Sequence, residues 1–555
     1  MGSVVRRFGV ALAAVALLAL PAIAAPVPMS NAKYEQPTIV MQAQNGQRLL
    51  DGFRSYLKLN GATKEMMEKV EAMIDGVLGE KGFAGIDMAK PIGGYAYLRA
   101  KAEDSSLIFV VPISTEKDAL AFLSRIKVEA REESKPKGVY GLHGGPFEAV
   151  PRAYLRFYDK HAYLSMNGGP ETLADADKLV PISRLVDDKE TAVVAATLTG
   201  KRLPKELTDG AYPLFDAMNQ EVDRMLVNAP RGMPKNFPPF LKEMLGWGRR
   251  SYDLMVGDGD TLAGRLLFDA KTGDLDLEAT LVPKAKTPLA DDLLTFKPAK
   301  GRFQQLVTPD AVVGAWVVLP GPVPKAVRNS FGGFWAEWIP MLGKESALPV
   351  ELGALFETFG QIAQKAIAAG ELDLGGAIFG PTKTGHYTAV AALGLDDPTP
   401  LVKLVLAVAK DLPKEFAAAI KLNAYKVGEV AVHTVDLEKL LPEGIRKVFG
   451  EKAALNIAVG NGGLFLAVGP NAEAELKRAM ALKPAETRAF NALVNLAKGK
   501  ELIAAGGGNP QDFGRIPSSE RLMSIYSLDV RGGSELKART SLGQLSFFTM
   551  MGFAH

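Results

Sequence analysis

Three short serine and lysine motifs are the residues of this chain that could carry out catalysis. Ser114 and Lys117 stand in an S-x-x-K pattern, Ser165 opens an S-x-N pattern, and Lys271 opens K-T-G, in this order along the chain. Each motif is short, and S-x-x-K and K-T-G occur again at residues 124–127 and 383–385. A competing interpretation is that Ser114 or its neighbour caps a surface helix and that Lys117 is solvated.

The order of these motifs resembles that of the penicillin-recognising serine enzymes. The resemblance implies that Ser114 attacks an acyl group, that Lys117 activates it, and that Lys271 lies on a strand lining the site. In this sequence K-T-G falls at an expected turn between two strands, and the segment between Ser114 and Lys271 is rich in strand patterns, not helical. A serine acyl-transferase or hydrolase that also uses Ser165 therefore stays an alternative hypothesis.

Composition argues against several other kinds of chemistry. The 555-residue chain has no cysteine, which excludes disulfides, thiol nucleophiles and cysteine-bound metals. No second histidine stands at a short spacing from His143 or His433, and the glycine run at 506–509 lacks the spacing of a phosphate loop. The net charge of +3 gives no field that would recruit nucleic acid. We expect no cofactor, no metal and no nucleic-acid partner.

The first 25 residues have the features of a secretory signal. Arg6 and Arg7 precede a short apolar run at residues 10–20, and Ala22-Ile23-Ala24 fits a cleavage site. The run is shorter than the roughly 20 residues that span a bilayer, and no later segment is long and apolar enough to do so. The sequence thus predicts cleavage near Ala24 and export to the periplasm or the cell exterior.

A repeated pattern organises the rest of the chain. Gly93-Gly94 and Gly375-Gly376 each begin an apolar strand that is followed by a turn and a second strand. Hairpins are expected at residues 152–166 and 454–468, and a three-strand meander over 251–256, 261–270 and 274–282. The predicted class is α+β. Two tandem repeated modules, residues 26–300 and 301–555, would each form a twisted antiparallel sheet with helices packed on one face.

This layout resembles a group of secreted bacterial proteins that carry domains of unknown function. The resemblance rests on Ile92-Gly93-Gly94 and Leu374-Gly375-Gly376 with the strands around them, and it extends over most of the mature chain. It implies no catalytic residues.

Two apolar groups of residues are candidate ligand contacts. A helix expected after Thr63 carries Met66, Met67 and Met73 on one face, and a second run contains Phe334, Trp335 and Trp338. Such side chains would either line an apolar site or seal the open face of a sheet. The preferred hypothesis is an exported, non-enzymatic envelope protein, a binding or scaffold module that holds an apolar ligand such as a lipid or a segment of a protein partner.

Overall fold

A computed structural model of the chain describes most of the residues after position 33. The described residues are 34–59, 64, 65, 67–69, 71, 72, 82–144, 147, 152–228, 237–269, 275–295, 299–318, 325–345, 350–395, 397–399, 401–403, 406, 407, 414–436, 443–508, 522–531 and 535–541. The predicted signal, Met66, Met73 and Lys271 lie outside them.

Strands and helices both occur throughout the chain. The first half contains β1 (Ile39–Ala43), α2 (Gly46–Leu59), β2 (Ile92–Tyr97), β3 (Ser106–Pro112), α4 (Glu116–Arg125), β4 (Glu129–Glu132), β5 (Val139–His143), β6 (Ala153–Tyr158), β7 (His161–Met166), the short 3₁₀ turns η3 (Pro170–Leu173), η4 (Ala176–Lys178) and η5 (Ile182–Arg184), β8 (Val194–Thr199), α5 (Lys205–Asp209), α6 (Tyr212–Val227), α7 (Phe237–Asp258), β9 (Gly259–Phe268), β10 (Leu275–Pro283) and α8 (Pro288–Thr295). The second half contains β11 (Ala299–Gly301), η7 (Phe303–Leu306), β12 (Ala311–Val318), α9 (Lys325–Glu345), α10 (Val350–Ala369), β13 (Asp373–Phe379), β14 (Thr388–Gly394), α12 (Lys414–Ala417), β15 (Ile420–Val427), β16 (Val430–Asp436), α13 (Glu443–Phe449), β17 (Ala454–Gly460), β18 (Gly463–Val468), α14 (Ala472–Ala481), β19 (Ala485–Thr487), β20 (Phe490–Asn495), α15 (Leu496–Ala505), β21 (Leu522–Arg531) and β22 (Glu535–Ser541).

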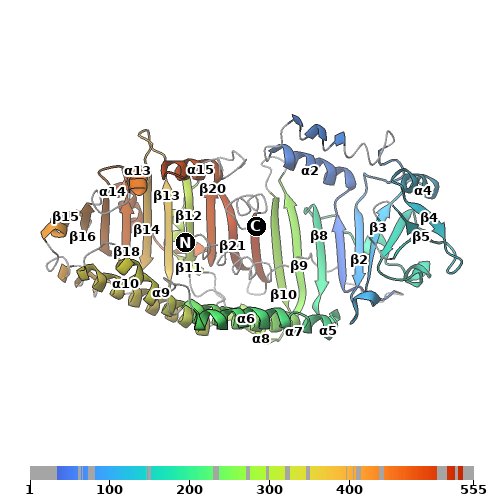
Figure 1. Ribbon diagram of the computed structural model, residues 1–555, viewed down its shortest axis with the longest axis horizontal. Helices are drawn as coiled ribbons and strands as arrows, with labels where there is room; N and C mark the ends of the chain where they lie inside the picture. Colours follow the sequence, from blue (N-terminus) through green and yellow to red (C-terminus); the bar gives the residue numbers. More distant parts are fainter. Residues whose placement is uncertain are drawn as a thin grey trace.

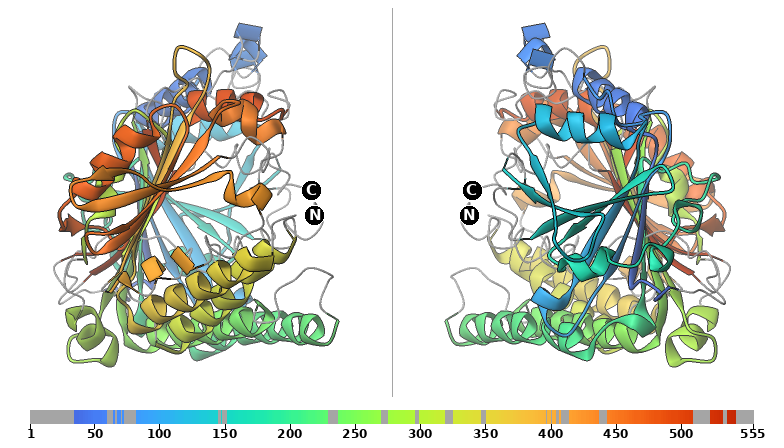
Figure 2. Two further views of the ribbon diagram at one scale, coloured as in Figure 1. Left: turned by 90° about the vertical axis from the view of Figure 1, so that its left-hand side faces the viewer. Right: turned by 90° about the vertical axis from the view of Figure 1, so that its right-hand side faces the viewer.

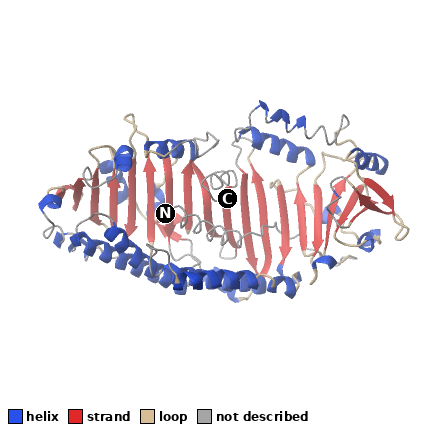
Figure 3. Cartoon of the chain, viewed as in Figure 1, coloured by secondary structure: helices blue, strands red, loops and turns tan. Residues whose placement is uncertain are grey.

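One antiparallel sheet of 20 strands runs through the molecule from end to end (Figures 1 and 3). Its strand order, from one edge to the other, is β4-β5-β6-β7-β3-β2-β1-β8-β9-β10-β22-β21-β20-β12-β13-β14-β18-β17-β16-β15. The sheet and the mixed helix and strand content confirm the predicted α+β class. The prediction of a separate sheet in each half was wrong, because β10 pairs with β22 and joins the strands of both halves.

Outward from this central pair, the strands follow each other in matching chain order. The first half continues as β9, β8, β1, β2, β3, β7, β6, β5 and β4, and the second as β21, β20, β12, β13, β14, β18, β17, β16 and β15. The strands toward the two outer edges of the sheet are therefore β4–β7 in the first half and β15–β18 in the second.

Helices pack on both faces of the sheet, which corrects the prediction that they cover one face. Neighbouring residues of a strand point to opposite faces. Phe465 of β18 packs with Leu476 and Ala479 of α14, whereas Leu464 packs with Ile367 of α10. We call the face carrying Leu464 the front face and the face carrying Phe465 the back face. Along the ends of the strands, α6, α7, α9 and α10 lie at one end and α2, α13 and α15 at the other (Figures 1 and 2).

The two Gly-Gly steps allow other segments to pack closely on the back face. A Cβ atom at Gly93 would lie 2.5 Å from Cδ1 of Ile182, and one at Gly375 would lie 2.5 Å from the carbonyl oxygen of Phe303. Such distances leave no room for a side chain. The first glycine of each step therefore lets η5 or η7 lie directly on the strand.

Local predictions were correct for the hairpins and wrong for part of the meander. The hairpins form as β6–β7 and β17–β18, close to the expected bounds. Residues 251–256, predicted as a strand, belong instead to the 22-residue helix α7. Among the described helices, none is both long enough and apolar enough to cross a membrane.

Candidate functional site

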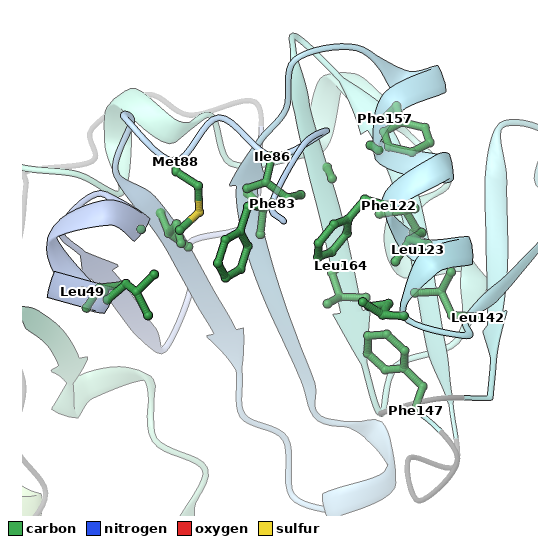
Figure 4. A pocket seen from close by; sticks show the side chains of 18 residues that line it. Leu49, Phe83, Ile86, Met88, Phe122, Leu123, Leu142, Phe147, Phe157 and Leu164 are labelled. Carbon is green, nitrogen blue, oxygen red and sulfur yellow. The ribbon is translucent and has the colours of Figure 1, made fainter. Parts of the chain in front are cut away.

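An apolar cavity of about 540 Å³ lies in the first half of the molecule, on the front face of the sheet. Its floor is formed by β2, β3, β5, β6 and β7, and its walls by α2, α4 and the segment that precedes β2. Figure 4 shows side chains from these elements pointing into a common space. The lining residues are Gly46, Leu49, Leu50, Phe83, Ile86, Met88, Ile92, Val111, Ala119, Phe122, Leu123, Ile126, Leu142, Phe147, Leu155, Phe157, Ala162 and Leu164.

The floor follows from the alternation of residues along the strands. Leu164 of β7 lies directly opposite Leu155 of β6 and Phe109 of β3, so these three share the front face. The residues between them point to the back face, where Tyr163 and Ile108 are buried in a separate core. The apolar residues of the front face therefore remain available to line a cavity.

Helix α4 forms one wall because its first turn is firmly capped. The Thr115 side chain accepts a hydrogen bond of 3.1 Å from the backbone N–H of Asp118, and the Thr115 hydroxyl donates to the Asp118 carboxylate at 2.7 Å. Such a cap stabilises a helix by about 1 kcal/mol. The helix then turns Phe122 and Leu123 toward the sheet.

The segment before β2 is held against both β3 and α4. Ile86 forms an isolated bridge with Ile113, and the backbone N–H of Ser114 donates to the carbonyl of Gly85 at 3.1 Å. The Arg125 guanidinium donates to the carbonyls of Gly82 and Ala84. These bonds fix the wall that carries Phe83, whose ring stacks with that of Phe122 at a centroid distance of 6.4 Å.

The chemistry of the cavity is that of a hydrocarbon site. Its lining contains no titratable, hydroxyl or amide side chain. Its volume lies within the roughly 300–1,000 Å³ typical of small-molecule sites. The lining has no side chain for acid–base or nucleophilic chemistry, and it favours ligands that lose no hydrogen bonds on leaving water.

The residues of the alternative enzyme hypothesis lie in different environments. Ser114 and Lys117 are exposed at the start of α4, whereas Ser165 is 0% exposed on the back face of β7. The Ser165 hydroxyl is 3.0 Å from the Thr172 hydroxyl. Lys271 lies outside the described residues, as noted above. The structure thus gives Ser114 a role in the cavity wall, through its backbone, and brings no described member of the set into contact with Ser165.

The described members of the predicted apolar ligand contacts, Met67, Phe334, Trp335 and Trp338, are not among the residues that line this cavity. Of the three methionines only Met67 is described, and it is half-buried. Phe334, Trp335 and Trp338 of α9 contact one another at centroid distances of 5.2–5.8 Å.

These α9 rings also meet the aromatic run of α7. The rings of Phe240 and Phe331 are 5.1 Å apart, and those of Phe237 and Phe334 are 5.4 Å apart. Phe331 and Trp335 also pack on the buried front-face residues Leu393 and Leu464. The two runs therefore form one cluster that links the helices of the two halves.

A second apolar pocket, of about 390 Å³, lies on the front face in the second half. Its lining includes Ala315 of β12, Gly376 of β13, Ala391 of β14 and Leu466 of β18. These four residues follow each other as directly opposed pairs. The pocket is therefore a stretch of the sheet surface itself, and small residues make it hollow.

None of the residues that line the two pockets is titratable. No group of three or more acidic or histidine residues that could hold a metal ion occurs in the described part of the chain. His433 is 6% exposed, and burial lowers its pKa below the ordinary value of 6.5. Its Nδ1 accepts a hydrogen bond of 3.2 Å from the backbone N–H of Asn423, which requires that nitrogen to be unprotonated.

Sequence reasoning missed most of the cavity wall. The apolar spacing of residues 115–126 does predict that Phe122 and Leu123 point inward. The sequence around Leu49, Phe83 and Met88 does not predict that these side chains share a site, because the wall is built from three separate segments that come together only in the folded protein.

Comparisons with family models, with curated proteins and with solved structures found no match.

Proposed function

We propose that this protein is an exported, non-enzymatic carrier that holds a hydrocarbon ligand, such as a lipid acyl chain, in the cavity between α2, α4 and the sheet. The observation that carries the proposal is the combination of a volume of about 540 Å³ with a lining of apolar side chains alone. Burying hydrocarbon in such a site gains about 25 cal/mol for each Å² removed from water.

The alternative is a scaffold with no ligand, and the cavity argues against it. Protein interiors are close-packed, and voids larger than a water molecule are few. The four residues Ala119, Leu142, Leu155 and Ala162 each reach the cavity although they are at most 8% exposed. An open apolar space bounded by such well-buried residues loses packing energy unless a ligand fills it.

We further infer that the two halves are copies of one ancestral α+β module, and that the chain acts outside the cytoplasm. The matching strand order outward from β10 and β22 supports the duplication. The signal-like first 25 residues support export. The place of action follows from the same proposal, since a carrier of hydrocarbon is useful in the aqueous space between or outside membranes.

The test is mass spectrometry of organic extracts from protein purified out of its native envelope fraction without detergent. The proposal predicts an apolar molecule in at least equimolar amount. The matched control is the same extraction from a Leu164→Trp variant, in which the indole fills the cavity and the yield falls. An extract from the native protein without such a molecule contradicts the proposal.

A further inference from the structure

A row of apolar residues crosses the front face from the cavity into the second half of the sheet. Each member lies directly opposite the next on the neighbouring strand, from β7 to β18. The fourteen members are Leu164, Phe109, Gly94, Met41, Ala196, Gly264, Ala279, Ala538, Leu528, Phe490, Val317, Leu374, Leu393 and Leu464. None has a charged or polar side chain. At about 4.8 Å between strands, the row is roughly 60 Å long.

The row connects the two pockets. At one end Leu164 lines the cavity. At the other end, three members of the row lie two residues away from lining residues of the second pocket: Val317 from Ala315, Leu374 from Gly376 and Leu393 from Ala391. Because residues two apart in a strand share a face, the second pocket lies beside the row.

The row and its surroundings are incompletely covered by protein. Leu374 in the row is 39% exposed. Val194 and Tyr526, each two residues from a member of the row, are 38% and 36% exposed. Exposed apolar side chains therefore occur at three separate points along the row, on β8, β21 and β13.

The back face of the same central strands has the opposite chemistry. Glu278, the neighbour of Ala279, contacts Lys537 at 2.7 Å and Arg265 at 3.2 Å. Charged groups are thus placed on one face of the central strands, and the other face is kept free of them across the whole row.

A hydrocarbon chain fits this surface better than a polypeptide does. The backbone groups of the central strands are paired with neighbouring strands, and the row offers no side-chain donors or acceptors. An extended peptide laid on it would leave its own N–H and C=O groups without partners, whereas an acyl chain loses nothing. Gly264, Ala279 and Ala538 are small, and larger residues such as Leu262 flank them on the same face.

We infer that the front face is a lipid track, in which acyl chains lie along the row from Leu164 to Leu374 and pass between the cavity and the second pocket. This inference rests on the proposed hydrocarbon binding and extends it from one cavity to the whole sheet. A chain bound in the first half then has a continuous row of apolar residues to follow into the second half. The protein would then let acyl chains move between the two pockets as well as hold them.

The absence of cysteine allows a direct test with single introduced thiols. Ala279 and Thr280 are neighbours in β10, both partly exposed, and they point to opposite faces. The experiment measures the rate at which a water-soluble maleimide modifies the Ala279→Cys and Thr280→Cys variants, with and without saturating oleate. The track predicts that oleate slows modification about tenfold in Ala279→Cys and leaves Thr280→Cys unchanged.

Other outcomes overturn the track and separate its failure from that of the cavity. If calorimetry shows oleate bound and Leu164→Trp lowers the amount, but Ala279→Cys is not protected, then the track is wrong and the cavity stands. If no oleate binds, then both are wrong. If protection appears together with a doubling of molecular mass in light scattering, a second copy covers the face, and the track is again wrong.

Discussion

Glu278 of β10 lies directly opposite Arg539 of β22, at the pair of strands where the two halves of the sheet meet. Their charged atoms are 3.9 Å apart, and the Glu278 carboxylate also contacts Arg265 and Lys537. Glu190 extends the group through Arg265, at 2.6 Å. Burial raises the pKa of Glu190, but hydrogen bonds from Arg265 and from the backbone of Ala192 and Thr191, together with the charge of Arg265, hold that pKa below its ordinary value. This buried ionic cluster fixes the central join of the sheet.

Glu278→Gln should destabilise the whole protein. Glu278 is only 5% exposed, and removal of its charge takes the carboxylate from the Lys537 ammonium, which is 12% exposed, at a cost of about 3 kcal/mol in the free energy of unfolding. Urea denaturation monitored by circular dichroism measures the loss. The control is Glu473→Gln in the exposed pair with Lys477, where about 0.5 kcal/mol or less is expected. Equal losses in the two variants would show that the central cluster contributes no more than a surface pair.

His433 should make stability depend on pH near neutrality. Because its folded-state pKa lies below 6.5, the unfolded chain binds more protons than the folded chain as the pH falls below that value. The contribution is fully present above pH 6.5 and is lost as the pH falls from there toward the folded-state pKa. We expect the free energy of unfolding to decrease over that window, and the decrease to be smaller in His433→Asn. The exposed His143→Asn is the control, and a slope unchanged by His433→Asn would contradict the prediction.

Gly375→Ala should be more damaging than Gly94→Ala, although both lie in Gly-Gly steps. The new methyl group at Gly375 meets the backbone oxygen of Phe303 at 2.5 Å, where nothing can move easily, and we expect a loss of about 2 kcal/mol. At Gly94 the nearest atom is Cε of Met41, a flexible side-chain end, at 3.2 Å, and the loss should stay below about 1 kcal/mol. Thermal denaturation of the two variants measures both losses of stability. A larger loss in Gly94→Ala than in Gly375→Ala would contradict the prediction.

The aromatic cluster between α7 and α9 should show energetic coupling. The rings of Phe240 and Phe331 are 5.1 Å apart, and such pairs contribute about 1 kcal/mol beyond the area they bury. A double-mutant cycle with Phe240→Leu and Phe331→Leu measures this term. The pair Phe122→Leu and Phe331→Leu, taken from two separate clusters, should be additive within about 0.5 kcal/mol. Additive effects in both cycles would mean that the two helices touch without stabilising each other.

Local features of the fold could be predicted from the sequence, and the long-range ones could not. Alternating residues and turn glycines gave both hairpins, and Thr115 was recognised as a possible helix cap. The join between β10 and β22 brings Asp276 opposite Ser541, and no local pattern records a pairing over that separation. Residues 251–256 alternate like a strand, yet they continue α7, because packing of the helix overrides a weak local preference.

The candidate site, too, could be predicted only in part from the sequence. The sequence indicated apolar ligand contacts, but it favoured Met66, Met67, Met73, Phe334, Trp335 and Trp338, which are the most conspicuous apolar residues. The cavity is lined instead by ordinary leucines and phenylalanines, and only the packing of α2 and α4 on the sheet distinguishes them from other core residues. Ser114, noted as a nucleophile in the alternative hypothesis, contributes its backbone to the cavity wall.

Calorimetric titration of oleate into the native protein and two tryptophan variants tests whether the cavity binds hydrocarbon. Leu164→Trp places an indole inside the cavity, whereas Leu226→Trp adds the same group to α6, where Leu226 is 44% exposed and far from the lining. Circular dichroism confirms that both variants fold. The account predicts that Leu164→Trp lowers the amount of oleate bound at saturation and that Leu226→Trp leaves it unchanged. Equal binding by all three proteins, or binding by none, would contradict a hydrocarbon site in this cavity.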